Sequence, residues 1–251
     1  MEAGAGILNE SVLYLPETES TNAWAKQNLD KFGPIGAVYT TCQTAGRGRL
    51  GRGWANAPGQ ALYYTAVLKT PLAQPGTLPL FASLAVADTL RQRYGVSCQI
   101  KWPNDLLLGG KKIAGILCEV APDGRTLLAG VGLNLAQDQA FFDAAGLPHA
   151  ASLALQGAAV DLAADPEWLA QYLTDFGFDR ALYTYEVEGF APYRAQYKAA
   201  CVNLGRRVTF DGGAGLAADI DGDGRLVVQT DGGETRVFTG EVSVQGIYGC
   251  V

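Results

Sequence analysis

The chain has 251 residues, of which 48% are hydrophobic and 18% are charged, and its formal net charge at pH 7 is −6. This length and composition are typical of a globular protein of one or two domains and exclude a disordered chain. A net acidic chain is not expected to coat nucleic acid, and no apolar run approaches the roughly 18 residues of a membrane helix. We therefore expect neither DNA nor a membrane as a partner.

Histidine and cysteine usage narrows the chemistry further. The chain has a single histidine, His149, so a multi-histidine zinc site is excluded and a Ser-His-Asp triad is disfavoured. His149 follows Pro148 and is expected to be structural. The five cysteines are scattered without a CxxC pair: Cys42, Cys98, Cys118, Cys201 and Cys250. They indicate reduced thiols, and residues 1–10 lack the basic and apolar regions of a secretory signal. A cytoplasmic location is expected.

Strands and helices alternate in the first hundred residues. Strands are predicted at 12–15, 37–43 and 61–69 from their β-branched and aromatic residues. Ser20, Thr21 and Asn22 offer N-cap groups for a helix that runs to about residue 29. The apolar residues of 79–94 recur at helical spacing, which predicts a second helix.

A hairpin is predicted next, with strands at 105–108 and 111–120 around Gly109-Gly110. A further strand is expected at 126–134. Asp165-Pro166 predicts the start of a long helix, as N-cap and first-turn proline, with Trp168, Tyr172 and Phe176 on one face. A second helical stretch is expected at about 192–201.

From Gly205 onward the texture changes to short strands separated by glycine and aspartate turns. The strands are predicted at 207–211, 216–220, 226–230, 235–239 and 242–246, which is typical of a small all-β barrel. Asp219–Gly224 is similar to the start of a calcium loop, but position twelve is Thr230, so a hairpin turn is predicted. We therefore expect an α+β domain over residues 1–203, followed by the barrel over residues 204–251.

A glycine- and arginine-rich segment, 47–59, is expected to be a mobile loop. Gly46, Gly48 and Gly51 match the GxGxxG pattern, but a dinucleotide site needs a helix at the third glycine, and the residues that follow do not favour one. The arginines of this segment present guanidinium forks that suit phosphate oxygens. A solvated basic loop is the alternative interpretation.

The predicted hairpin carries an acid and a base on one face. A two-glycine turn pairs Leu107 with Lys112 and Asp105 with Ala114, which makes Asp105 and Lys112 diagonal neighbours. Lys111 falls on the opposite face. The carboxylate could hold Mg²⁺ and the ammonium could neutralise phosphate charge. Taken alone, the two residues are better explained by turn chemistry after Pro103 and by an exposed hairpin lysine.

Two smaller features lie beside these motifs. The glycines of 130–134 permit close approach of a ligand to the backbone, or a tight turn, and Asn134 offers a donor and an acceptor. Trp54 and Trp102 flank the charged motifs, where each could stack on a ligand ring or pack in the core.

In order and spacing, the motifs resemble those of the biotin–protein ligase family over nearly the whole chain. The residues that carry the resemblance are Glu19–Asn22, Gln43–Arg49, Lys101–Asp105, Gly110–Leu117 and Gly130–Asn134. The resemblance implies an α+β, class II synthetase-like ligase domain with a mixed sheet flanked by helices, followed by an SH3-like barrel. Because the family's first strand begins near Val12, no room is expected for the N-terminal DNA-binding domain of the repressor members.

The resemblance implies a reaction in two steps. Biotin and Mg²⁺-ATP give biotinyl-5′-AMP and pyrophosphate, and a lysine of a biotin carboxyl carrier protein then takes the biotin and releases AMP. The protein is expected to be a monomer or a homodimer. A lipoate or octanoate ligase or transferase of the same superfamily is the main alternative, and a catalytically inactive binding module is a second. The segments 46–49 and 101–105 favour biotin, and an intact Lys112 disfavours the inactive module.

The resemblance also implies roles for individual residues. Lys112, Arg47 and Arg49 correspond to catalytic residues, and Asp105 to a metal ligand. The residues implied to bind biotin are Ser20, Thr21, Asn22, Gln43, Arg47, Gly48, Arg49, Lys112 and Gly115. Those implied to bind the nucleotide are Arg47, Arg49, Trp54, Asn104, Asp105, Lys112 and Asn134.

Overall fold

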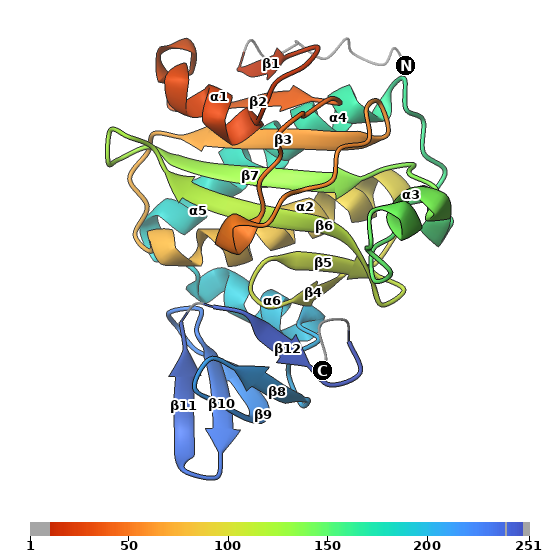
Figure 1. Ribbon diagram of the computed structural model, residues 1–251. Coiled ribbons are helices and arrows are strands. Elements are labelled where there is room, and N and C mark those ends of the chain that lie inside the picture. The colour runs from red at the N-terminus through yellow and green to blue at the C-terminus, as the bar shows by residue number, and fades with distance from the viewer. Residues whose placement is uncertain (1–10, 239, 248–251) are drawn as a thin grey trace, which may run out of the picture.

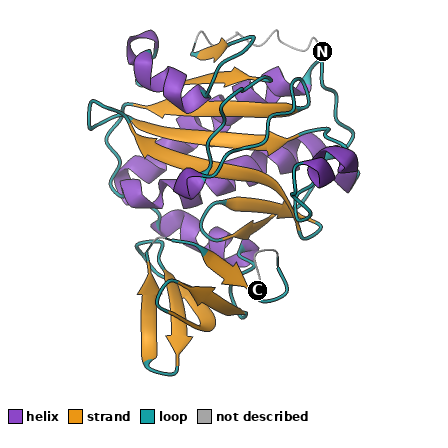
Figure 2. Ribbon diagram, in the orientation of Figure 1, coloured by secondary structure: helices purple, strands orange, loops and turns teal. Residues whose placement is uncertain are grey.

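The computed structural model describes residues 11–238 and 240–247. Features expected at residues 1–10, 239 and 248–251, including Cys250, lie outside these residues. Figures 1 and 2 show a large sheet with helices packed on it, and below it a smaller unit built from the last strands of the chain.

The large sheet has seven strands in the order β1-β2-β3-β7-β6-β5-β4. The strands are β1 (Val12–Tyr14), β2 (Ile35–Thr40), β3 (Ala61–Leu68), β4 (Gln99–Lys101), β5 (Asp105–Leu108), β6 (Lys111–Val120) and β7 (Leu127–Asn134). β1 and β2 are parallel, and the other neighbours are antiparallel. The expected mixed sheet is therefore confirmed, together with every predicted strand, whereas the short β4 was not predicted.

Both faces of this sheet are covered, because side chains alternate between its faces. Val38, Val67 and Leu128 pack with α1 (Thr21–Gln27) in a small cluster. The side chains that alternate with these three along β2, β3 and β7 point to the other face of the sheet. There they join the main core, which includes α2 (Leu78–Tyr94). The remaining helices are α3 (Gln139–Ala144), α4 (Asp165–Tyr172), α5 (Arg180–Glu188) and α6 (Arg194–Ala200).

The predicted long helix from Asp165 is not one regular helix. A π-helical segment, Leu173–Asp179, separates α4 from α5. The N-cap is Ala164 and not Asp165, because the fully buried Asp165 carboxylate accepts hydrogen bonds from Arg93 at 2.7 Å and Tyr94 at 2.6 Å. Aromatic side chains do share one face as predicted, since Tyr172 stacks on Trp168 and on Phe176.

The smaller unit is a five-stranded antiparallel sheet in the order β11-β10-β9-β8-β12. Its strands are β8 (Arg207–Phe210), β9 (Gly213–Ile220), β10 (Leu226–Thr230), β11 (Gly233–Val237) and β12 (Val242–Val244). Asp221 accepts hydrogen bonds from the backbone of Asp223 and Arg225 between the antiparallel strands β9 and β10, which confirms the predicted hairpin turn. Within the described residues no pairing joins β11 to β12, so closure into an SH3-like barrel stays a prediction, as does the boundary at residue 204.

The two sheets share one continuous hydrophobic core. The buried Trp102 donates from its indole nitrogen to Gly224 O at 3.0 Å, in the β9–β10 turn. Its backbone nitrogen donates to Asn203 Oδ1 at 2.7 Å. Trp102 therefore packs in the core where the two sheets meet, which is one of the two roles expected for it. None of the helices among the described residues combines the length and apolarity needed to cross a membrane.

Candidate active site

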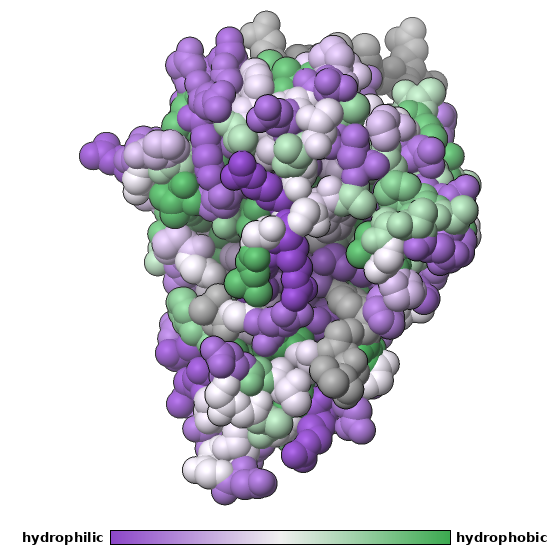
Figure 3. All heavy atoms as spheres, viewed as in Figure 1, coloured by the Kyte–Doolittle hydropathy of each residue, from purple (hydrophilic) through white to green (hydrophobic). Residues whose placement is uncertain are grey.

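A cavity of about 400 Å³ opens on the face of the large sheet opposite α2. Its walls come from the start of α1, the 47–59 segment, strands β5, β6 and β7, residues 141–150, and Gly240–Val242 of the smaller sheet. In Figure 3 hydrophilic side chains gather around the 47–59 segment at the centre of this face, and a more hydrophobic area lies over α3 beside it.

One end of the cavity is lined by uncharged polar groups at the start of α1. Ser20 is the N-cap of α1 and accepts from the backbone nitrogen of Ala23 at 3.4 Å, as predicted. Gln43 Oε1 accepts from the backbone nitrogen of Thr21 at 2.9 Å. Ser20, Thr21, Asn22 and Gln43 are all buried, so the structure brings the four residues together at one end of the cavity.

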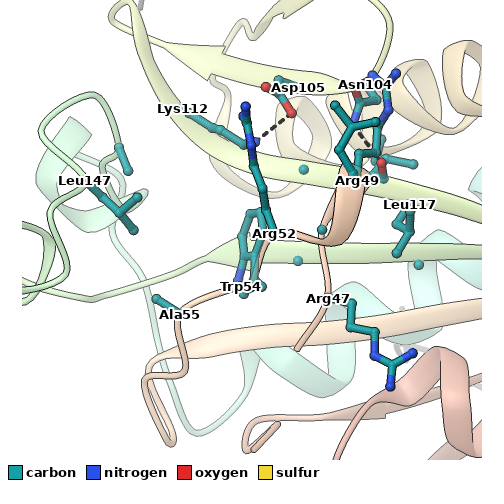
Figure 4. Close-up of a pocket in the computed structure, with 18 of the residues that line it drawn as sticks. Arg47, Arg49, Arg52, Trp54, Ala55, Asn104, Asp105, Lys112, Leu117 and Leu147 are labelled. Carbon is teal, nitrogen blue, oxygen red and sulfur yellow. Dashed lines mark hydrogen bonds and ion pairs between the residues drawn. The ribbon is translucent and has the colours of Figure 1, made fainter. Parts of the chain in front are cut away.

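The other end carries the predicted acid–base pair. Lys112 Nζ lies 2.7 Å from Asp105 Oδ1 (Figure 4). The register that led to this expectation is wrong at one position, because a β-bulge shifts the pairing and Asp105 lies opposite Gly115, not Ala114. The bulge adds one residue to β6, which places Gly115 instead of Ala114 beside the pair.

The backbone of Lys112 is fixed from a segment that follows α3. Its nitrogen donates to His149 O at 2.8 Å, and its carbonyl accepts from the nitrogen of Ala151 at 2.9 Å. His149 thus supports the cavity wall, in agreement with the structural role expected for it. The neighbouring Lys111 is exposed and does not line the cavity, and its ammonium donates to Pro148 O at 2.7 Å.

Arginines of the 47–59 segment bridge the two sheets. Arg49 donates to Asn104 Oδ1 at 2.8 Å and to the carbonyl of Gly240 at 2.9 Å. Arg52 forms an ion pair with Glu241. Burial lowers the pKa of Arg49, although nearby Asp105 and Glu241 oppose this shift. In Figure 4 Arg47 extends away from these contacts, toward α1.

The two predicted asparagines have their amide groups engaged in the scaffold. Asn104 accepts from Arg49 and donates to Ile116 O at 2.8 Å. Asn134 donates to Ala151 O at 3.0 Å and accepts from Gln137 at 3.1 Å. Both residues line the cavity, and their described bonds hold its walls together.

Part of this site was not predicted from the sequence. Lys101 is buried in the cavity wall, where burial lowers its pKa while Asp105 opposes the shift. Lys101 belongs to the 101–105 motif, and it pairs with Asp105 across β4 and β5. The motif was therefore a signal that could have identified this lysine. The wall formed by residues 141–150 and the approach of Gly240–Val242 depend on the tertiary fold, and no local pattern predicted them.

The cavity offers few side chains that could hold a metal ion by themselves. No cluster of three or more His, Cys, Asp or Glu side chains suited to a metal occurs within the part of the chain that the structure describes. Asp105 is a single carboxylate already paired with Lys112. Because Mg²⁺ often binds through one or two carboxylates together with substrate phosphates, the residues fit an ion that arrives with a nucleotide.

Trp54 covers the floor of the cavity. Its ring lies against Gly115 and Gly132, where a Cβ atom would approach ring atoms at 2.7 Å and 2.6 Å respectively. Lys112 Nζ lies 5.4 Å from the ring centroid, within cation–π range. The two glycines therefore allow the indole to lie flat beside the lysine.

The glycine at position 115 gives a testable prediction. We expect Gly115→Ala to displace Trp54 and Lys112, because the added methyl would also lie 3.2 Å from Lys112 Cε. Pyrophosphate release from ATP in the presence of biotin should fall about tenfold, with a stability loss of about 1–2 kcal/mol. The matched control is Gly222→Ala, where a Cβ meets nothing within 4 Å. Equal rates in the two variants would contradict the prediction.

The backbone of residues 47–53, the first part of the 47–59 segment, makes few hydrogen bonds. Gly48 N donates to Arg52 O at 2.7 Å, and Trp54 N donates to Gly46 O at 2.9 Å. Leu50, at its tip, is 69% exposed and has a left-handed backbone with φ of 56°, which is unfavourable for a residue with a side chain. Little apolar burial therefore stabilises this conformation.

We expect the backbone amides of residues 47–53 to exchange rapidly in the free protein and at least about tenfold more slowly with biotin and ATP bound. The arginines of this segment repel one another and its glycines are flexible, so both disfavour order without a ligand. Hydrogen exchange followed by mass spectrometry measures this, with the amides of β3 as an internal reference. Strong protection of residues 47–53 in the free protein would contradict the prediction.

Comparison with known proteins gives consistent results. The model of the Biotin/lipoate A/B protein ligase family matches residues 14–135, and that of the Biotin protein ligase C terminal domain matches residues 204–244. The chain is 35% identical over 252 residues to a biotin--[acetyl-CoA-carboxylase] ligase of Mycobacterium tuberculosis, covering 95% of this chain and 91% of that protein. It is 32% identical to the ligase of the same name from Paracoccus denitrificans, covering 92% and 100%.

A solved structure supports the fold. The biotin protein ligase from Aquifex aeolicus in complex with biotin and ATP superimposes with a TM-score of 0.78 at 24% identity, covering 94% of this chain and 99% of that one. This likeness concerns the fold alone.

Proposed function

Since this chain belongs to the biotin protein ligase family, we propose that it activates biotin as biotinyl-5′-AMP with ATP and transfers it to a lysine of a biotin carboxyl carrier protein. The observation that carries the proposal is one cavity with a neutral polar end at Ser20–Asn22 and a cationic end at Lys112, Lys101 and Arg49. The neutral end suits the ureido ring of biotin, and the cationic end suits a carboxylate and a phosphate that must react.

The first chemical step needs charge neutralisation. A biotin carboxylate that attacks the α-phosphate of ATP brings two anions together, so fixed cations lower the barrier. Lys112 is positioned by Asp105 and Trp54, and we assign it to the carboxylate and the α-phosphate. Arg49, held by Asn104 and Gly240, is assigned to the phosphate, and Arg47 and Gly48 to the segment that covers the bound adenylate.

The second step uses the product of the first. The ε-amine of the carrier lysine attacks the acyl carbon of biotinyl-5′-AMP, the amide bond forms and AMP leaves. Described contacts assign no general base to this step, and the site requires no covalent enzyme intermediate. We propose that two further cavity residues, Gly115 and Trp54, shape the pocket around biotin and the nucleotide respectively.

Magnesium belongs to the proposal as an ion that accompanies ATP. When bound, it would neutralise phosphate charge, and Asp105 is the described carboxylate placed to contribute a ligand at the cationic end. Asn104 and Asn134 are assigned to the nucleotide side as wall residues. An SH3-like closure of the smaller sheet, the division at residue 204 and a cytoplasmic location are proposed with the same reaction.

The main alternative substrate is lipoate or octanoate. The relatives that share 32–35% identity across nearly all of this chain are named as biotin ligases, which favours biotin. The test is incubation of the protein with ATP, Mg²⁺ and either biotin or lipoate, with pyrophosphate release as the first readout. Mass analysis of a purified carrier domain then measures transfer. Release with lipoate but not with biotin would overturn the proposal.

A further inference from the structure

Residues 141–150 form a wall of the cavity that has little support of its own. Phe142 is buried, but every residue from 143 to 149 is exposed. Two backbone hydrogen bonds shape the turn inside the wall, from Leu147 N to Phe142 O at 2.8 Å and from Ala150 N to Leu147 O at 3.0 Å. A segment with little buried apolar surface has low local stability, so bonds from outside the wall decide how firmly it is held.

Three hydrogen bonds attach the end of this wall to the first two residues of β6. Lys112 N donates to His149 O at 2.8 Å, and Ala151 N donates to Lys112 O at 2.9 Å. The third bond comes from a side chain, because the ammonium of Lys111 donates to Pro148 O at 2.7 Å, and a charged donor makes a stronger bond than a neutral one. Pro148 lines the cavity and Lys111 does not, so this lysine holds the wall from behind.

The two ends of the cavity indicate which substrate group meets the wall. In the proposed function biotin extends from the neutral polar end to the cationic end, so the nucleotide base lies beyond the phosphates at the cationic end. The wall adjoins that end through its bonds to Lys112, and Asn134, assigned to the nucleotide side, donates to Ala151 O directly after the wall. The side chains that line the cavity from the wall include Phe141, Phe142 and Leu147. Such apolar and aromatic groups suit the face of a purine ring.

We infer that Lys111 is a positioning residue for ATP, which holds the 141–150 wall against the purine through its hydrogen bond to Pro148 O. The inference rests on the proposed function. Lys111 touches no substrate in it, so its loss should weaken nucleotide binding and leave the chemical step nearly unchanged. The two adjacent lysines of β6 thus serve different parts of one reaction, Lys112 the reacting groups and Lys111 the base of the nucleotide.

The variant Lys111→Met tests this role, because methionine has a similar length but cannot donate to Pro148 O. We expect the KM for ATP in biotin-dependent pyrophosphate release to rise about three- to fivefold, with kcat and the KM for biotin changed less than about twofold. At saturating ATP the rate should therefore stay close to that of wild type. Lys111→Arg retains a charged donor and should restore the KM for ATP to within about twofold of wild type.

An inhibitor without a base separates this role from a direct effect of the lysine charge on the phosphates. Inorganic tripolyphosphate has groups for the cationic end alone, so its inhibition constant should agree within about twofold between wild type and Lys111→Met. The matched control is Lys69→Met, which removes another lysine that donates to a backbone carbonyl, Phe32 O, where neither residue lines the cavity. This control should retain the wild-type KM for ATP.

Hydrogen exchange measures how firmly the wall is held, without catalysis. The backbone amides of Leu147 and Ala150 donate within the wall. We expect them to exchange about threefold or more faster in free Lys111→Met than in wild type, because the wall opens more readily without its bond to β6. In Lys111→Arg and Lys69→Met the same amides should exchange at close to the wild-type rate.

The possible outcomes are distinguishable. An unchanged KM for ATP in Lys111→Met, an equal loss of affinity for ATP and tripolyphosphate, or unchanged exchange at Leu147 and Ala150 would overturn the inference, as would a Lys111→Arg variant that behaves like Lys111→Met. A wild type that releases no pyrophosphate with biotin would instead overturn the proposed function. Calorimetric titration with ATP and hydrogen exchange of the wall would still test the role of Lys111 in that case.

Discussion

Replacing Lys112 by alanine is expected to lower biotin-dependent pyrophosphate release by about 10²–10³-fold, whereas Lys111→Ala should change it less than about threefold. The two lysines are adjacent, but only Lys112 lines the cavity, paired with Asp105 and 5.4 Å from the Trp54 ring centroid. Lys111 does not line the cavity, and its ammonium donates to the carbonyl oxygen of Pro148. The Lys112→Ala change removes a fixed positive charge from the place where the biotin carboxylate and the α-phosphate of ATP must meet.

Initial rates of pyrophosphate release, with saturating ATP and Mg²⁺, measure the effect. Lys112→Ala should remain folded, because Lys101 stays close enough to Asp105 to stabilise the carboxylate, and a partly exposed ion pair contributes about 1 kcal/mol or less. Thermal melting therefore serves as the control for both variants. Comparable losses of rate in Lys111→Ala and Lys112→Ala would contradict the assignment.

Local patterns predicted most of the elements that build the site. The N-cap of α1, the two-glycine turn between β5 and β6, and the strands β3 and β7 each carry their signal within a few residues. The pairing of Lys112 with Asp105 followed from the hairpin, although the bulge that moves Gly115 opposite Asp105 did not. A bulge depends on packing of the neighbouring strands, which the hairpin sequence alone does not encode.

Features without a clear local signal were missed. The three-residue β4 becomes a strand by pairing with β5, and α3 follows β7 as a short helix capped by Asp138. Asp165 looked like a cap because aspartate at the start of a helix usually is one. Its burial against Arg93, 72 residues away, is a tertiary contact, and the π-helical segment that follows α4 has no simple sequence signal.

The contact between the two sheets is the tertiary feature with the largest consequence for the site. Gly240 accepts a hydrogen bond from Arg49, and Glu241 pairs with Arg52, so the smaller sheet supplies part of the cavity wall. A basic segment and a glycine 191 residues apart cannot be related by a local pattern. This contact makes the smaller sheet part of the proposed catalytic unit.

A chain ended after Leu204 is therefore expected to lose both stability and ligation. Removing the smaller sheet exposes Trp102 and Leu80, which are 3% exposed in the full chain, and leaves the Trp102 indole without Gly224 O. Loss of that burial costs about 3–5 kcal/mol, which corresponds to a melting temperature lower by roughly 10 °C or more. Thermal melting followed by circular dichroism measures the first effect and carrier biotinylation the second.

A point variant separates the two losses. Glu241→Gln removes only the charge that faces Arg52, an exposed pair worth less than about 1 kcal/mol, so its melting temperature should stay within about 3 °C of wild type. Its rate of carrier biotinylation should nevertheless fall about two- to fivefold, because one of the two described contacts between the segment that carries Arg49 and the smaller sheet is weakened. Glu234→Gln breaks a similar exposed pair with Arg236 within the smaller sheet, away from the cavity, and should leave the rate unchanged. A truncated chain that melts and biotinylates like the full protein would show that the smaller sheet is an independent unit, contrary to the contacts described here.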